Sequence, residues 1–204
     1  MRNWVVWGGV LLAVGVPIIA SMLSPQLAWR QPVYIVGGFG GIAALAILLI
    51  QPMLAGGYLP GLSPLRMRQL HRIIGGLLVA AVVVHVAALW VTSPPDVVDA
   101  LLFASPTPFA VWGVTAMWAV FVSALLVVLR RHLKLSTRIW RRFHTGLAVL
   151  IVGGSVLHAV LIDGTMEVLS KYALCLLVCL VSLKTIAARG AWSKRAQRQT
   201  SEKV

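Results

Sequence analysis

The sequence predicts an all-α membrane protein with six transmembrane helices and both termini on the cytoplasmic side (N-in/C-in). Of its 204 residues, 59% are hydrophobic and 11% are charged. A soluble domain carries about a quarter charged residues, so an ordinary soluble domain is excluded. The same apolar excess excludes a disordered chain. The apolar residues form continuous stretches instead of short alternating segments, which indicates helices and not a β-barrel.

Each of the six apolar stretches is long enough to cross a hydrocarbon core, which takes about 17–25 residues as a helix. The first stretch is too long for the core of a signal peptide and lacks small residues at a plausible cleavage point, so we interpret it as a span. Only Gly164 separates the last two, which predicts a tight hairpin. We expect one six-span domain, residues 1–187, followed by a basic cytoplasmic tail, residues 188–204. The expected spans are residues 4–23, 33–55, 70–92, 109–130, 143–163 and 165–187.

The charges give the orientation. Sixteen of the 18 Lys and Arg residues fall in segments that this topology places on one side, and four of the five acidic residues fall on the other. Positive residues stay on the cytoplasmic side of a membrane, so this side is the inner one. The net charge of +13 therefore reflects topology, with contact to anionic membrane lipid as a by-product. Nucleic acid is not an expected partner, because the cations are spread over loops at the membrane edge.

Four of the five histidines form two pairs with one spacing. His71 and His85 lie in the third span, His144 and His158 lie in the fifth, and both separations are 14 residues. Fourteen residues rise about 21 Å and turn about 1400°, so each pair shares a helix face to within about 40°. The third and fifth spans run in the same direction. His71 therefore comes level with His144, and His85 with His158, in two layers of facing imidazoles. His132 lies in a basic loop, and no specific role is expected for it.

Facing imidazoles within a membrane suggest a cofactor. Ionisable side chains inside spans are rare and mark function by default. Two neutral imidazoles on opposite sides of a porphyrin are what a six-coordinate haem b requires. We therefore expect a haem-binding helical bundle with two haem b groups, held non-covalently because the sequence has no C-x-x-C-H motif. A proton relay and a polar packing cluster are the alternatives. Zinc is disfavoured because neither layer offers a third ligand.

Other residues near the histidines have two interpretations each. Arg72 and Arg142 either pair with haem propionates or anchor the helices at the cytoplasmic edge. The glycine run at residues 37–41 lies within a span and follows no strand, so we interpret it as a helix-packing surface and not a phosphate loop. Four further glycines would leave room for a porphyrin or let helices pack closely: Gly75, Gly76, Gly146 and Gly154.

Two sequence runs resemble a known family. They are Arg68-Gln69-Leu70-His71-Arg72 followed by His85, and Trp140-Arg141-Arg142-Phe143-His144 followed by His158. Both resemble the ferric reductase-like transmembrane domain. That family includes the NADPH oxidases, the ferric reductases and the bacterial haem subunit of the periplasmic methionine sulfoxide reductase system. The resemblance covers all six spans and implies two stacked b haems that carry electrons across the membrane. It assigns His71 with His144 to the inner haem and His85 with His158 to the outer haem.

The sequence departs from the pattern of this family in two respects. The oxidases and reductases carry a flavin- and nicotinamide-binding module after the sixth span, whereas a short basic tail follows here. We therefore expect the electron donor to be another protein or quinol. The methionine sulfoxide reductase subunits often have a basic residue in place of His71, and this chain keeps all four histidines.

The expected function is transmembrane electron transfer in a bacterial-type inner (plasma) membrane, as an oxidoreductase component without a catalytic residue of its own. The expected donor is a flavoprotein or quinol, and the external acceptor is ferric chelate, a partner reductase or oxygen. One alternative is a quinol-oxidising cytochrome b subunit, which also uses 14-residue histidine spacings. Another is the haem subunit of a periplasmic methionine sulfoxide reductase. A non-redox transporter or accessory protein is the second class, but the sequence shows neither a pathway of ionisable groups nor repeated broken helices.

Overall fold

The computed structural model describes residues 2–130 and 132–201, with side chains for residues 3–130 and 132–188. This part of the chain is helical and contains no strand. Six of its helices are long and apolar enough to cross a membrane, which confirms the prediction of an all-α, multi-pass membrane protein. The elements are α1 (Arg2–Met22), the short 3-10 helix η1 (Pro25–Trp29), α2 (Pro32–Gly56), α3 (Pro64–Thr92), α4 (Pro94–Leu101), α5 (Ala110–Leu129), α6 (Thr137–Leu161) and α7 (Val168–Ser201).

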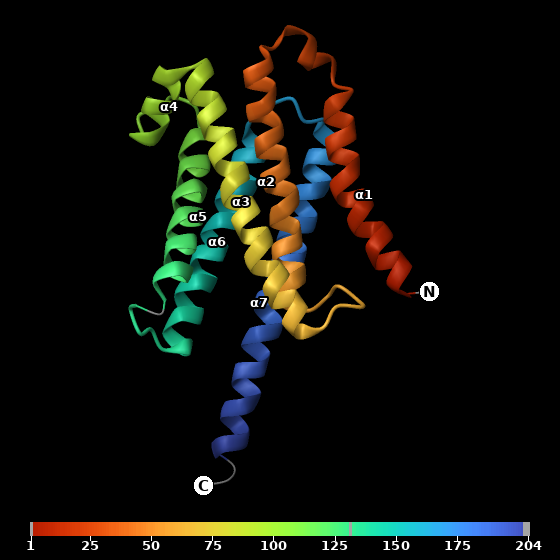
Figure 1. Ribbon diagram of the computed structural model, residues 1–204, viewed down its shortest axis with the longest axis vertical. Coiled ribbons are helices and arrows are strands. Elements are labelled where there is room, and N and C mark those ends of the chain that lie inside the picture. Colours follow the sequence, from red (N-terminus) through yellow and green to blue (C-terminus); the bar gives the residue numbers. More distant parts are fainter. Residues whose placement is uncertain (1, 131, 202–204) are drawn as a thin grey trace.

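The six long helices run up and down the bundle in alternation (Figure 1). The start of α1, the end of α7 and the α2–α3 and α5–α6 connections lie at one end of the molecule, while α4 and the α6–α7 connection lie at the other (Figure 1). The first end carries the basic segments 64–72 and 130–142, and we call it the basic end. The separation of charge that the sequence predicts is thus a property of the folded bundle.

Two helices begin earlier than the apolar pattern predicts. α3 begins at Pro64 instead of residue 70, because Ser63 Oγ accepts a hydrogen bond from the backbone N–H of Arg66 at 3.3 Å. α6 begins at Thr137 instead of residue 143, and Ser136 Oγ caps it in the same way. A serine cap satisfies an N–H group that the first helical turn leaves without a partner. Hydropathy detects only the apolar part of such a helix, so both polar first turns escaped the prediction.

The end of the chain also differs from expectation. α6 ends at Leu161 and α7 begins at Val168, so the predicted one-residue hairpin turn is a link of residues 162–167. The helix continues past the apolar span Val168–Ala188 to Ser201, so the backbone of the predicted tail extends α7. The side chains of the tail from residue 189 on, residues 202–204, Arg131 and the side chain of Arg2 lie outside the described part.

The core joins two helix pairs. α2 packs closely on α3 and α5 packs closely on α6, and α7 packs against both α2 and α6. Leu174 and Val178 of α7 are 1% and 0% exposed at the centre of this contact. The pair formed by α3 and α6 is not among the closely packed helix pairs of the described residues. The other buried members of the core are Leu45, Leu48, Leu49, Leu78, Ala119, Val120, Ile151 and Cys175.

Close packing between α5 and α6 depends on a missing side chain. A Cβ at Gly154 would lie 2.8 Å from the carbonyl oxygen of Trp112, whereas a Cβ at Gly153 would meet nothing within 4 Å. We predict that Gly154→Ala lowers the free energy of unfolding by about 1–3 kcal/mol through overpacking, and that Gly153→Ala leaves it nearly unchanged. Thermal unfolding in detergent measures both. Equal stability of the two variants would contradict the packing described.

Glu167 caps the first turn of α7. It precedes the helix and lies outside the apolar span. Its carboxylate accepts hydrogen bonds from the backbone N–H groups of Ser170 and Leu169, both at 2.7 Å, and these bonds lower the pKa of the Glu167 carboxyl. A lowered pKa contributes stability above the unfolded-state value, and this is lost as the pH falls through the folded-state value. Glu167→Gln should therefore lower the melting temperature at about pH 7, and by less as the pH falls through the folded-state pKa of the carboxyl. Asp163→Asn, on the same link, controls for the loss of a charge.

Candidate functional site

The four paired histidines meet across the space between α3 and α6. The ring centroids of His71 and His144 lie 6.2 Å apart with planes at 77°. Those of His85 and His158 also lie 6.2 Å apart, with planes at 78°. We call His71 and His144 the basic-end pair, and His85 and His158 the opposite-end pair. The structure thus brings together the two layers in the pairing that the 14-residue spacing predicts.

The separation of the rings has a chemical meaning. A bond of about 2 Å between a metal and an imidazole nitrogen puts two rings that share one metal ion roughly 6 Å apart. Among the described residues, no group of three or more His, Cys, Asp or Glu side chains is placed to hold a metal ion. A layer with two nitrogen ligands therefore suits an ion whose remaining ligands come from a macrocycle. By this measure the histidines fit haem.

Helix carbonyls orient the opposite-end pair. His85 Nδ1 donates to the carbonyl oxygen of Gly37 on α2 at 2.7 Å. His158 Nδ1 donates to the carbonyl oxygen of Phe109, the residue that precedes α5, at 3.0 Å. A ring that donates from Nδ1 carries its lone pair on Nε2, and such outer hydrogen bonds are typical of histidines that bind metals. In both rings Nδ1 is used as a donor, so Nε2 is the nitrogen that is left for a metal.

A glycine lets each of these rings reach its carbonyl. Gly41 lies four residues after Gly37, and a Cβ there would be 3.1 Å from His85 Nδ1. Gly113 lies four residues after Phe109, and a Cβ there would be only 2.6 Å from His158 Nδ1. One helical turn thus supplies a carbonyl acceptor and, next to it, the space for the ring. The sequence prediction explained the glycine run by packing alone and missed both of these roles.

The basic-end pair is oriented differently. His71 Nδ1 donates to the backbone carbonyl of Gln51 at 3.2 Å, and the Gln51 side-chain amide donates to the His71 carbonyl at 3.4 Å. His144 Nδ1 lies 3.1 Å from Ser123 Oγ. Gln51 and Ser123 are each 9% exposed. Neither residue was predicted, although a polar side chain in an apolar span is the signal that marks both.

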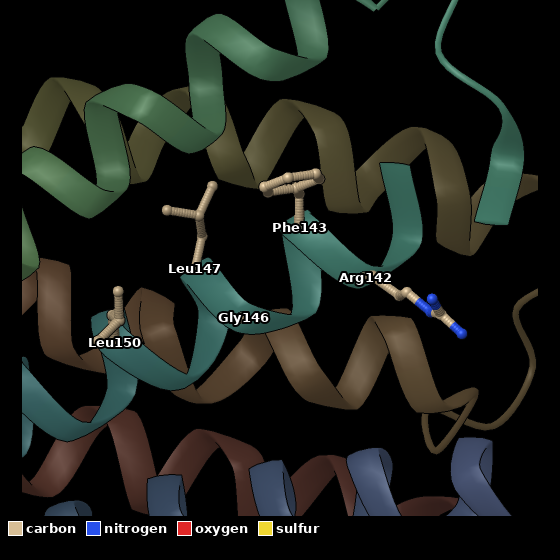
Figure 2. A pocket seen from close by; sticks show the side chains of 5 residues that line it. All are labelled: Arg142, Phe143, Gly146, Leu147 and Leu150. Atoms are coloured by element: carbon tan, nitrogen blue, oxygen red, sulfur yellow. The ribbon is translucent and has the colours of Figure 1, made fainter. Parts of the chain in front are cut away.

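Arg72 and Arg142 lie at the level of the basic-end pair but on other helix faces. They are about 100° and about 160° around their helices from His71 and His144, and both are exposed. Arg72 lines a cavity of about 490 Å³ together with Gln69 and Ile73. Figure 2 shows Arg142 directed away from the side chains that line its own cavity of about 420 Å³. That cavity is also lined by Phe143, Gly146, Leu147 and Leu150.

The four glycines named beside the histidines separate into different roles. Gly154 serves the contact between α5 and α6, and a Cβ at Gly75 would lie 3.5 Å from the Gln51 side-chain nitrogen. A Cβ at Gly76 or at Gly146 would meet nothing within 4 Å. Only these last two leave open space next to the helix.

The family follows from a comparison with family models. The model of the ferric reductase like transmembrane component matches residues 37–155. The chain belongs to this family. The match extends from Gly37, the acceptor for His85, through most of α6, and it includes three of the four histidines. His158 lies three residues beyond it. The resemblance of the histidine runs to the ferric reductase-like transmembrane domain is thereby confirmed. Neither a search of curated proteins nor a search of solved structures gave a match.

The glycine that supports His158 gives a test of the ring geometry. In ¹⁵N-histidine-labelled protein we predict that NMR detects a protonated Nδ1 on His85 and on His158. Gly113→Ala should change the His158 signal and lower the free energy of unfolding by about 1–3 kcal/mol, because the new methyl group occupies the place of the ring. Gly146→Ala, with open space around its Cβ, is the control. An unchanged His158 signal in Gly113→Ala would contradict the arrangement.

Proposed function

We propose that this ferric reductase-like chain is a transmembrane electron-transfer protein that binds two haem b groups, one between His71 and His144 and one between His85 and His158. The observation that carries the proposal is the repeated separation of 6.2 Å between paired rings on α3 and α6. When bound, haem b supplies a one-electron couple whose potential depends on its axial ligands and its burial.

The chain would fix the position and the properties of both groups. The 14-residue spacing separates the two layers by about 21 Å along α3 and α6, so the pairs lie at two depths of one bundle. Hydrogen bonds from Nδ1 to helix carbonyls raise the basicity of an imidazole ligand. Two histidines in each layer would hold one haem, and donor and acceptor would then exchange electrons with it without binding to its iron.

The charge distribution supports an orientation for this transfer. The basic end carries the cations of segments 64–72 and 130–142, which favours the cytoplasmic side. The basic-end pair would then be the inner site, in a bacterial-type inner membrane. The exposed guanidinium groups of Arg72 and Arg142 would offer charge to the propionates there. The proposed donor is a cytoplasmic flavoprotein or quinol, and the proposed acceptor is ferric chelate, a partner reductase or oxygen.

Haem content tests the ligand assignment. Purified protein should contain about two b haems per chain with low-spin spectra, because two histidine nitrogens would bind each iron. His85→Ala or His158→Ala should remove one of the two haems without unfolding the bundle. His132→Ala, at an exposed position in the α5–α6 connection, is the matched control and should keep both. Protein that lacks haem when haem supply is adequate, or an unchanged haem-to-protein ratio in His85→Ala, would refute the proposal.

A further inference from the structure

In the basic-end pair, the His144 ring lies against a side-chain hydroxyl. His71, His85 and His158 donate from Nδ1 to a backbone carbonyl oxygen. His144 Nδ1 lies 3.1 Å from the hydroxyl of Ser123. A hydroxyl rotates and both donates and accepts, so this contact constrains the plane and tautomer of the ring less than a helix carbonyl does.

An aromatic ring lies against His144. The Trp140 indole, one helical turn toward the basic end, stacks on the imidazole with a centroid separation of 5.1 Å and planes only 7° apart. The guanidinium carbon of Arg130 lies 4.4 Å from the centroid of the same indole, a cation–π contact. Phe109, by contrast, contacts the His158 ring edge-on, with planes at 70°.

The surroundings of the indole nitrogen indicate whether Trp140 acts through its N–H group or through its flat ring. Trp140 Nε1 is buried and has no hydrogen-bond partner among the described residues. Burying an N–H group without a partner costs stability, so tryptophans usually find one. The position of Trp140 is thus poor for its N–H group but well suited to its flat ring.

We propose that Trp140 is a positioning residue that sets the plane of the His144 ring, with Arg130 holding the indole in place. The nearly parallel stack of indole and imidazole restricts the plane of the ring, which the Ser123 hydroxyl constrains less tightly. The proposal rests on the proposed haem ligation, and it identifies what distinguishes the basic-end site from the opposite-end site.

The angle between the two imidazole planes provides a direct readout. In a low-spin ferric haem with two imidazole ligands, the g anisotropy of the electron paramagnetic resonance spectrum depends on that angle, which is 77° at the basic-end pair. A His85→Ala background should leave only the basic-end haem, so its signal can be recorded alone. Haem content of this background is measured first, and a value near zero refutes the proposed ligation instead of the role of Trp140.

Two substitutions at Trp140 separate the flat ring from the N–H group. In the His85→Ala background, Trp140→Phe should keep the parental g values, because it retains an aromatic ring and loses only an N–H without a partner. Trp140→Leu should shift or broaden the largest g value, or lose the remaining haem while the protein stays folded. Arg130→Gln should change the signal in the same direction as Trp140→Leu but by less.

A matched control excludes a general effect of losing a tryptophan from the bundle. Trp118 on α5 is half exposed and contacts the Phe121 ring edge-on at 84°. Trp118→Leu should leave the spectrum unchanged. A parental spectrum with full haem content in Trp140→Leu would overturn the proposal, and so would equal shifts in Trp140→Phe and Trp140→Leu.

Discussion

The geometry of the histidine site depends on the hydrogen bond between a histidine ring and a backbone carbonyl oxygen of the neighbouring helix. At the opposite end, His85 donates to Gly37 and His158 donates to Phe109. Both bonds need the partner helix to come close enough for a ring to touch backbone. Glycine permits this approach, because it places no side chain between the ring and the carbonyl. In an apolar membrane interior a ring N–H without such a partner would carry a free-energy cost.

The contacts of the four histidines lie within two halves of the bundle. In one half α2 orients the histidines of α3, and in the other α5 and the residue that precedes it orient those of α6. The halves are joined through α7, whose Leu174 and Val178 are almost fully buried. α3 and α6 are therefore free to face each other through their histidines instead of through close helix packing. A gap between two supported helices is the geometry that a flat macrocycle needs.

The two histidine pairs have the same separation between ring centroids, but different groups orient their rings. The same local arrangement holds each of the opposite-end rings. A backbone carbonyl accepts the hydrogen bond, and a glycine four residues later leaves space for the ring. At the basic end, the Gln51 carbonyl accepts a hydrogen bond from the His71 ring, and the Gln51 side chain donates one to the His71 carbonyl. His144 lies against the Ser123 hydroxyl and the Trp140 indole. Because the hydrogen bonds and packing around a ligand influence its basicity and orientation, the same pair of histidines is placed in two different environments. Such a difference is one way for a single fold to give two cofactors unequal properties.

The sequence by itself determined the class of the protein and its histidine pairs. Apolar length, charge asymmetry and a spacing of 14 residues are local or periodic quantities, and a helix of constant rise and twist converts them directly into depth and face. The six spans and the pairing of His71 with His144 and of His85 with His158 follow from those quantities alone. The same reasoning misplaced the starts of α3 and α6, because serine caps outside the apolar pattern set them.

Only the tertiary structure decided what surrounds the paired histidines. Gln51 precedes His71 by 20 residues, Gly37 precedes His85 by 48 and Phe109 precedes His158 by 49. No periodicity within one helix relates such distant positions. Which turn of α2 or α5 lies opposite which histidine depends on how two helices pack, and packing is fixed by shape complementarity along their whole length. The glycine run at residues 37–41 shows the limit well: its composition indicated close packing, but only the folded bundle showed that a histidine ring is what packs there.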